Sequence, residues 1–357
     1  MSLFEGLRVI DLSTVLAGPS VGMFFAELGA EVIKIENPTT GGDVTRHWKL
    51  PSEQTDLKVS AYFASINYRK QYEFMDLANP SGRDELRKRI ASADILITNF
   101  KSGDAEKFEL DSQSLRLINP RLIHGRIKGF TSDEVRVAFD VVLQAETGFM
   151  YMNGTPQSGP VKMPVALIDV LAAHQLKEGI LCALIQRSTT GKGQVVDVSL
   201  EQAGMASLVN QASNYLMAGV VPGAAGSLHP NIAPYGETFA CSDGRLLVLA
   251  VGSDRQFAAL CAATGVESLS EDPRFSNNQQ RVIHRKALAD VLGERFIMRD
   301  RDAWMEELVN RKVPAGAIRS MDEVMMNPAA QALIRSETID GIQTRRLASA
   351  VFRISEL

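Results

Sequence analysis

One acidic residue follows an apolar run at the point where the chain is expected to enter a helix. Asp169 comes directly after the segment 164–168, PVALI, and opens a long stretch with apolar residues at helical spacing. Such a carboxylate can cap the helix, which stabilises it by about 1 kcal/mol. It can also be a nucleophile, with the helix amides expected to lower its pKa and keep it ionised. The local sequence by itself favours the cap.

A second acid and several cations add candidates for the same site. Asp140 follows Phe139 in an apolar neighbourhood, and fits a cap or an ion pair as well as a functional group. Open α/β sheets collect ligands beyond the carboxyl ends of their strands. Basic residues expected near such ends are Lys34, Arg46, Arg69, Lys70, Lys101 and Lys107. Each of them singly is compatible with ordinary solvated surface charge.

Other chemistries find less support. The five histidines and three cysteines show no metal-ligand spacing, and no G-x-S-x-G elbow is present. The first βα turn reads DLSTVLAGPSVG rather than G-x-G-x-x-G, although Glu36 imitates the ribose-binding acid of a dinucleotide site. His174, early in the helix after Asp169, favours a packing or surface role. The sequence therefore gives only weak support to a nicotinamide enzyme.

The segments around these candidate residues are expected to alternate between strand and helix. The segments 7–12 and 31–35 are apolar and rich in β-branched residues, and 18–28 between them has helical spacing. Further strands are expected within 64–77, 93–100 and 121–130, with a charged helix over 81–92. This alternation predicts an open, doubly wound and mostly parallel sheet.

The second half of the chain predicts one more strand and a smaller domain. A helix is expected over 169–186, a strand over 194–200 and a long helix over 201–217. A Gly/Pro-rich stretch begins near residue 216 and marks a linker, 216–224. Beyond it, a hairpin with its turn at 242–245 and three helical segments indicate a small α+β domain over 225–320.

Composition narrows the class of protein. The 357 residues are 45% hydrophobic and 22% charged, with a net charge of −4. An acidic chain with dispersed basic residues does not favour nucleic acid. No apolar run reaches the roughly 20 residues of a membrane span, and no secretory signal is visible, so we expect a cytoplasmic protein with no membrane partner.

Nine segments, in order along nearly the whole chain, resemble the class III CoA-transferases. This family includes formyl-CoA transferase, the carnitine CoA-transferases and the α-methylacyl-CoA racemases. The matching segments are LRVIDLSTVLAGP, LGAEVIKIENPTTGGDVTRHW, ADILITNF, AFDVVLQAETGFM, PVALIDVLAAHQLKEGILCAL, TTGKGQVVDVSL, HPNIAPYGETFACSDG, EDPRF and VPAGAI. Each is weak by itself, whereas the ordered set is specific.

The resemblance implies an architecture that spacing could not give. It implies a large CoA-binding α/β domain formed by residues 1–215 and 321–357, with the small domain inserted. It also implies a homodimer of interlocked chains, with the CoA site between the large domain of one and the small domain of the other. No permanently bound cofactor or metal is implied, and CoA, acyl-CoA and small carboxylic acids are the partners.

The resemblance also assigns roles to particular residues. Asp169 becomes the nucleophile, which forms an aspartyl mixed anhydride and then an aspartyl-CoA thioester. Phe139 and Asp140 match an aromatic–acid pair beside it. The residues implied to bind CoA are Leu16, Ala17, Lys70, Asn99, Phe100 and Lys107.

Departures from the family pattern separate its branches. The racemases place a histidine where this chain has Phe139, so the usual two-base proton transfer lacks one partner. Leu16 replaces a glutamine that some members use, and SLHPNIAPYG stands where formyl-CoA transferase has a glycine-rich flap. An acyl-CoA:carboxylate CoA-transferase is therefore the leading prediction, with a racemase or a catalytically idle CoA-binding homologue as alternatives.

Overall fold

The protein divides into two compact units. We analysed a computed structural model that describes residues 2–132 and 136–356. The larger unit comprises Met1–Asn153, Pro160–Gly223 and Ala329–Leu357, and the smaller comprises Gly154–Gly159 and Ala224–Pro328. The short segment 154–159 and residues 321–328 thus belong to the smaller unit, which the sequence did not indicate.

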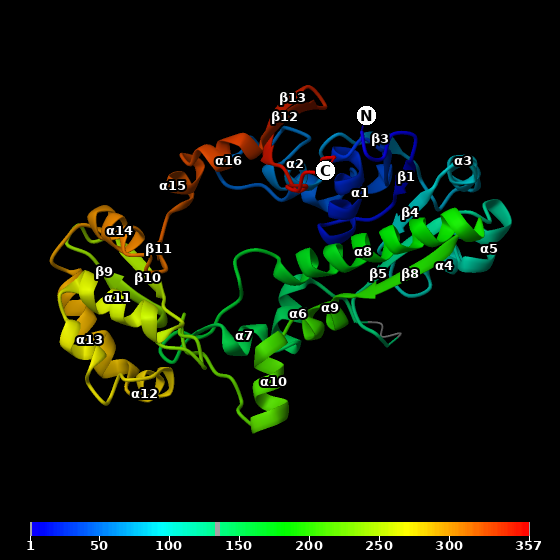
Figure 1. Cartoon of the computed structure of the whole chain (residues 1–357). Coiled ribbons are helices and arrows are strands. Elements are labelled where there is room, and N and C mark those ends of the chain that lie inside the picture. Colours follow the sequence, from blue (N-terminus) through cyan, green and yellow to red (C-terminus); the bar gives the residue numbers. More distant parts are fainter. Residues whose placement is uncertain (1, 133–135, 357) are drawn as a thin grey trace. The chain divides into compact units, whose positions relative to one another are not determined.

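A six-stranded parallel sheet organises the larger unit. Its order is β3-β2-β1-β4-β5-β8 (Figure 1). The strands are β1 Arg8–Asp11, β2 Glu31–Glu36, β3 Gln71–Phe74, β4 Ile95–Thr98, β5 Ile123–Lys128 and β8 Gln194–Ser199. The order reverses between β1 and β4, so the loops after these two strands lie side by side, where doubly wound sheets hold their ligands. The predicted α/β fold class is confirmed.

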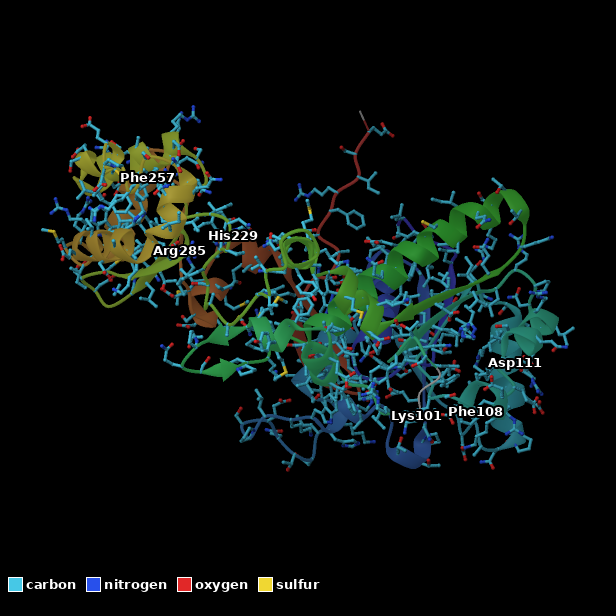
Figure 2. The ribbon with its side chains drawn as sticks, turned by 90° about the horizontal axis from the view of Figure 1, so that it is seen from below. Lys101, Phe108, Asp111, His229, Phe257 and Arg285 are labelled. Carbon is cyan, nitrogen blue, oxygen red and sulfur yellow. The ribbon has the colours of Figure 1, made fainter. Side chains whose placement is uncertain are left out.

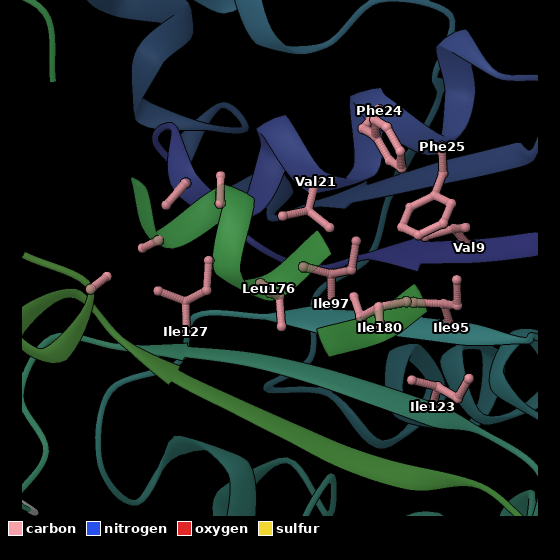
Figure 3. Close-up of a cluster of buried hydrophobic side chains, with 14 of the residues drawn as sticks. Val9, Val21, Phe24, Phe25, Ile95, Ile97, Ile123, Ile127, Leu176 and Ile180 are labelled. Carbon is pink, nitrogen blue, oxygen red and sulfur yellow. The ribbon is translucent and has the colours of Figure 1, made fainter. Parts of the chain in front are cut away.

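Helices cover both faces of this sheet because successive strand residues point to opposite sides. On one face, α1 (Ala17–Glu27) and α8 (Leu167–Thr190) pack on Val9, Ile95 and Ile97 (Figure 3). On the other face, α3 (Pro80–Ala91) and α5 (Ser112–Ile118) pack on the intervening residues Ile10 and Leu96. Both faces are thus removed from water at the centre of the sheet, where β4 is buried at every position.

Shorter elements complete the larger unit. They are η1 Pro38–Thr40, η2 Val44–His47, α2 Ala61–Ile66, α4 Asp104–Lys107, α6 Asp140–Glu146, α7 Phe149–Met152, α9 Leu200–Ala206, α10 Val209–Ala218, β12 Ile334–Ile339 and β13 Ile342–Leu347. The prediction of one helix over 201–217 was wrong, since Ser207 and Leu208 separate α9 from α10 and Val209, the first residue of α10, has φ of +41°. The β12–β13 hairpin, which was not predicted, buries Ile339 with Phe63 of α2.

The smaller unit contains a three-stranded antiparallel sheet. Strands β9 (Tyr235–Ala240) and β10 (Leu246–Ala250) form the predicted hairpin, and β11 (Ala315–Ala317) pairs with β10. The helical elements are α11 Asp254–Thr264, η3 Glu267–Ser270, α12 Asn278–Ile283, α13 Arg285–Phe296, α14 Arg301–Asn310, α15 Met321–Met325 and α16 Pro328–Leu333, which runs on into the larger unit. A two-stranded ribbon, β6 (Gly154–Thr155) with β7 (Gly159–Pro160), completes the chain.

The loop that precedes β9 is held by two arginines of the helices beside it. Arg285 donates to the carbonyls of His229 and Ile232 at 2.9 and 2.7 Å, and both Arg285 and His229 are marked in Figure 2. Arg281, which is fully buried, donates to the carbonyl of Ala233 at 3.0 Å. The family-like segment HPNIAPYG is therefore bonded to the helices of the smaller unit at three of its carbonyl groups.

Candidate active site

The loop between β1 and α1 is strained and held from several sides. Val15 has φ of +73°, a conformation that is unfavourable for a β-branched residue. The Asn99 side chain accepts from the Thr14 N–H at 3.0 Å and donates to the Thr14 carbonyl at 2.8 Å. Asp43 Oδ1 accepts from the Val15 N–H at 3.4 Å. Asn99, which follows β4, thus holds the loop that leads to Leu16 at the switch point of the sheet, where the strand order reverses between β1 and β4. Strain kept in this way is common at functional sites.

Lys70 lies beneath this loop, away from solvent. Its ammonium donates to Asp11 Oδ2, to the Pro19 carbonyl and to Asn67 Oδ1, each at 2.8 Å. The side chains of Lys70 and Asp11 are fully buried. Burial by itself would raise the pKa of Asp11, but the ammonium groups of Lys70 and Lys34 lower it below its ordinary value. Lys70 therefore supports the loop, and its ammonium does not reach a surface where a phosphate could bind.

Two further buried ion pairs contain basic residues that the sequence had offered as candidates for ligand binding. Lys34 pairs with Asp43 at 3.0 Å, and neither side chain is exposed. Arg46 pairs with Glu36 at 2.6 Å, also out of contact with water. Glu36 is thus occupied within the protein, which removes the acid that imitated a ribose-binding group.

An aromatic pair with exposed cations follows β4. Phe100 packs against Phe108 with ring centroids 5.7 Å apart, and Lys107 Nζ lies 5.3 Å from the Phe108 ring. Lys101 and Lys107 are exposed, and Figure 2 marks Lys101 beside Phe108. Phe100, Phe108 and Lys107 thus place apolar ring surface next to positive charge near the switch point.

Asp169 lies in the first turn of α8 and is only 6% exposed. Ala166 occupies the capping position, so the interpretation of Asp169 as the helix cap was wrong. Within the described part of the chain, its carboxylate has no hydrogen-bond partner. Burial and the nearby Asp140 carboxylate raise the pKa of Asp169 to about 7. The expectation that helix amides would lower this pKa was therefore also wrong.

Asp140 explains why the pKa of Asp169 is raised rather than lowered. It stands in the first turn of α6, where its Oδ1 accepts from the Ile168 N–H at 2.7 Å and from the Asp169 N–H at 3.4 Å. The amides that would have stabilised Asp169 are thus bonded to another carboxylate. Phe139, the residue before α6, is 46% exposed. The structure brings Asp140 and Asp169 together, as the family pattern implied for residues beside the nucleophile.

Tyr62 of α2 joins this acidic site, although no motif in the sequence marked it. Burial, followed by the charges of Asp169 and Asp140, raises the pKa of Tyr62 to about 12. Its ring packs edge-on against Trp48 at a centroid separation of 5.2 Å. A neutral phenol, able to donate a hydrogen bond, therefore lies near the two carboxylates. Only the fold brings these residues together, since α2 and α8 are about a hundred residues apart in sequence.

The described chain lacks a metal-binding cluster and a membrane-spanning helix. No group of three or more His, Cys, Asp or Glu residues there is arranged to hold a metal ion. No described helix is both long and apolar enough to cross a membrane.

Comparison with known proteins shows the family to which the chain belongs. The model of CoA-transferase family III matches residues 4–355, nearly the whole chain. The chain belongs to CoA-transferase family III. It is 37% identical to succinate–glutarate CoA-transferase of Agrobacterium fabrum over 334 residues, which cover 92% of this chain and 83% of that protein. It is 32% identical to human succinyl-CoA:glutarate CoA-transferase, covering 91% and 73% of the two chains.

A solved structure agrees with this assignment. The crystal structure of a CaiB/BaiF family protein from Brucella suis matches with a TM-score of 0.84 and 37% identity, covering 99% of this chain and 93% of that one. The protein is therefore an enzyme that transfers CoA between carboxylic acids, with CoA thioesters as substrates. The predicted family is confirmed, and the nicotinamide alternative has no further support.

Proposed function

We propose that this CoA-transferase exchanges CoA between succinyl-CoA and a dicarboxylic acid of about the size of glutarate, with Asp169 as its covalent nucleophile. The observation that carries the nucleophile is the Asp169 carboxylate, which is 6% exposed and has no hydrogen-bond partner among the described residues. Support for the acids comes from the names of relatives from Agrobacterium fabrum, mouse and human, all of which pair succinate with glutarate.

The chemistry proceeds by two exchanges at one carboxylate. Asp169 attacks the carbonyl of the donor thioester, the C–S bond breaks, and a mixed anhydride and CoA thiolate form. The thiolate attacks the aspartyl carbonyl of the anhydride, which releases the donor acid and leaves an aspartyl-CoA thioester. The acceptor carboxylate then repeats both steps in reverse, so that free Asp169 and the new acyl-CoA result. Covalent catalysis keeps the energy of the thioester bond throughout, and burial keeps water from the anhydride.

The ionisation of Asp169 predicts the pH dependence of the reaction. Only the carboxylate form attacks, and its pKa is raised to about 7. The fraction of reactive enzyme therefore falls as pH decreases through 7, and kcat/KM should fall about tenfold per pH unit below it. The measurement is kcat/KM for succinyl-CoA across buffers of constant ionic strength. A rate that stays constant down to pH 5 would contradict this role of the carboxylate.

CoA binding is proposed at the switch point of the sheet. The strained loop that leads to Leu16 and Ala17 lies there and is held by Asn99. Phe100 and Lys107 supply ring surface and positive charge nearby. Lys70 supports this loop from within the protein and is not proposed to contact CoA.

Replacing Lys107 tests that proposal. Lys107→Ala should raise KM for succinyl-CoA about five- to tenfold with little change in kcat, because a phosphate contact far from the reacting atoms contributes uniform binding. Lys88→Ala, an exposed lysine of α3, is the matched control. An equal effect of the two substitutions would place the CoA phosphates elsewhere.

The enzyme is further proposed to act as a homodimer, and its cytoplasmic location stays a prediction. In the described chain no residue of α10 is buried, and its Tyr215, Leu216 and Met217 are exposed together. An apolar patch of this kind is typical of an interface. Sedimentation at micromolar concentration should give twice the chain mass of 39.0 kDa.

A CoA-exchange screen separates the proposed function from its alternatives. Succinyl-CoA is incubated with a panel of mono- and dicarboxylic acids, and new acyl-CoA is measured by mass spectrometry. Formation of glutaryl-CoA supports the proposal. Deuterium wash-in at the α-carbon without an acceptor acid would indicate a racemase, and tight CoA binding without exchange would indicate an idle homologue.

A further inference from the structure

The junction of α6 and α8 contains a carboxylate that the reaction described above does not use. Asp140 accepts from the N–H groups of Ile168 and Asp169 at 2.7 and 3.4 Å. Its second oxygen accepts from the Gln144 amide at 2.7 Å. Both Asp140 and Gln144 belong to α6, one turn apart, and so lie on the same side of that helix. The cap of α8 is thus supplied by a different helix.

Gln144 holds this carboxylate in place. Its side chain is fully buried, its Oε1 accepts from the Met163 N–H at 2.8 Å, and its Nε2 also approaches the Val165 carbonyl at 3.4 Å. The amide therefore ties α6 to the segment that leads into α8. Because both oxygens of Asp140 accept hydrogen bonds, one from the start of α8 and the other from the buried Gln144, Asp140 has little freedom to turn away from α8.

We infer that Asp140 is a positioning residue: it caps α8 from outside, which withholds the helix amides from Asp169, and it holds its own negative charge beside that carboxylate. This inference rests on the proposed function, in which Asp169 is the nucleophile. Left uncapped, the first turn of α8 would offer its N–H groups and partial positive charge to Asp169. With Asp140 in place, the oxygens of Asp169 keep their lone pairs for attack on the thioester. The raised pKa of Asp169 agrees with this arrangement.

Few other groups bear on the charge of Asp169. The ionisable groups that interact with it in the described chain are Asp140 on α6 and the phenol of Tyr62 on α2. The elements packed against α8 are α1, α6, α9, β5 and β8. Their other charged groups have different partners: Glu27 with Arg346, Glu146 with Arg136, Glu201 with Thr131, His124 with Thr98, and Arg126 and Lys128 with Asp197. On α8 itself, His174 interacts with Lys177 and Glu178.

A matched pair of substitutions tests the inference through the pH profile of kcat/KM. Asp140→Asn keeps an oxygen that can cap α8, since Asn is as good a cap as Asp, but it removes the charge. Gln144→Met removes the hydrogen bond between Gln144 and Asp140 but leaves the negative charge of Asp140. We expect the acid limb of Asp140→Asn to move to lower pH by about one pH unit, because a neighbouring like charge has been removed. The acid limb of Gln144→Met should stay where it is in the wild type.

Two results would overturn the inference. An unchanged acid limb in Asp140→Asn, or the same shift in both variants, overturns the inference, because a purely structural role would affect both alike. If Asp140→Asn does not fold, Asp140→Ser supplies a second neutral cap and is judged in the same way. Failure of the proposed function is distinguishable, since it would appear as exchange activity in Asp169→Asn. An inactive Asp169→Asn with an unshifted Asp140→Asn removes this inference only.

Discussion

Replacing Asp169 with asparagine or alanine is expected to reduce CoA exchange by roughly four orders of magnitude or more. The proposed reaction forms two covalent bonds to this carboxylate in turn, and neither replacement can form them. A neutral amide has nearly the same shape as the carboxylate, so a loss in Asp169→Asn reports on chemistry rather than on packing. The measurement is the initial rate of CoA exchange with saturating donor and acceptor.

The same substitution should leave the protein at least as stable as the wild type. A buried carboxylate without a hydrogen bond opposes folding when it is charged, because burial penalises the charged form. Removing it relieves that penalty above pH 7, where Asp169 is ionised. Thermal unfolding at pH 8 should therefore give Asp169→Asn an equal or higher Tm. Loss of activity together with loss of folding would leave the nucleophile unsupported.

Chemical trapping supplies an independent measurement of the covalent intermediate. Hydroxylamine added with succinyl-CoA should convert Asp169 to its hydroxamate, which peptide mass spectrometry detects. Asp84→Asn on α3, whose side chain is 63% exposed, serves as the control and should be modified at position 169 as readily as the wild type. Modification at another carboxylate, with Asp169 unchanged, would assign the nucleophile elsewhere.

Periodicity predicted the larger unit well because its strands are buried on both faces. Runs such as ILIT in β4 are buried at every position and apolar at all but the last, and Gly- or Pro-marked turns separate them from helices. The β12–β13 hairpin lacks that signal, since β12 reads IRSETI and has apolar residues only at its two ends. The break between α9 and α10 was missed for a different reason, because no glycine or proline marks it.

The sequence named the acidic residues of the candidate active site but could not give their environment. Asp169 is identifiable from its position after an apolar run, whereas its ionisation depends on Asp140, 29 residues earlier. Sequence spacing cannot show that the α8 amides are taken by that residue. Lys70 is a similar case, because a lysine beyond a predicted strand has the same sequence signal whether it meets solvent or a buried aspartate. Tertiary contacts, and not local patterns, decide both pKa values and available charges.

Lys70→Met is expected to lower the free energy of unfolding by about 3–5 kcal/mol, because it leaves the fully buried Asp11 carboxylate without its ammonium partner. The measurement is urea unfolding followed by circular dichroism. Lys88→Met, on a side chain that is 74% exposed, should change stability by less than about 0.5 kcal/mol. Combining Lys70→Met with Asp11→Asn should recover part of the loss, since the double variant buries no unpaired charge at this position. If Lys70→Met destabilises no more than Lys88→Met, the ammonium does not support the loop as the contacts indicate, and Lys70 becomes available again as a ligand for CoA.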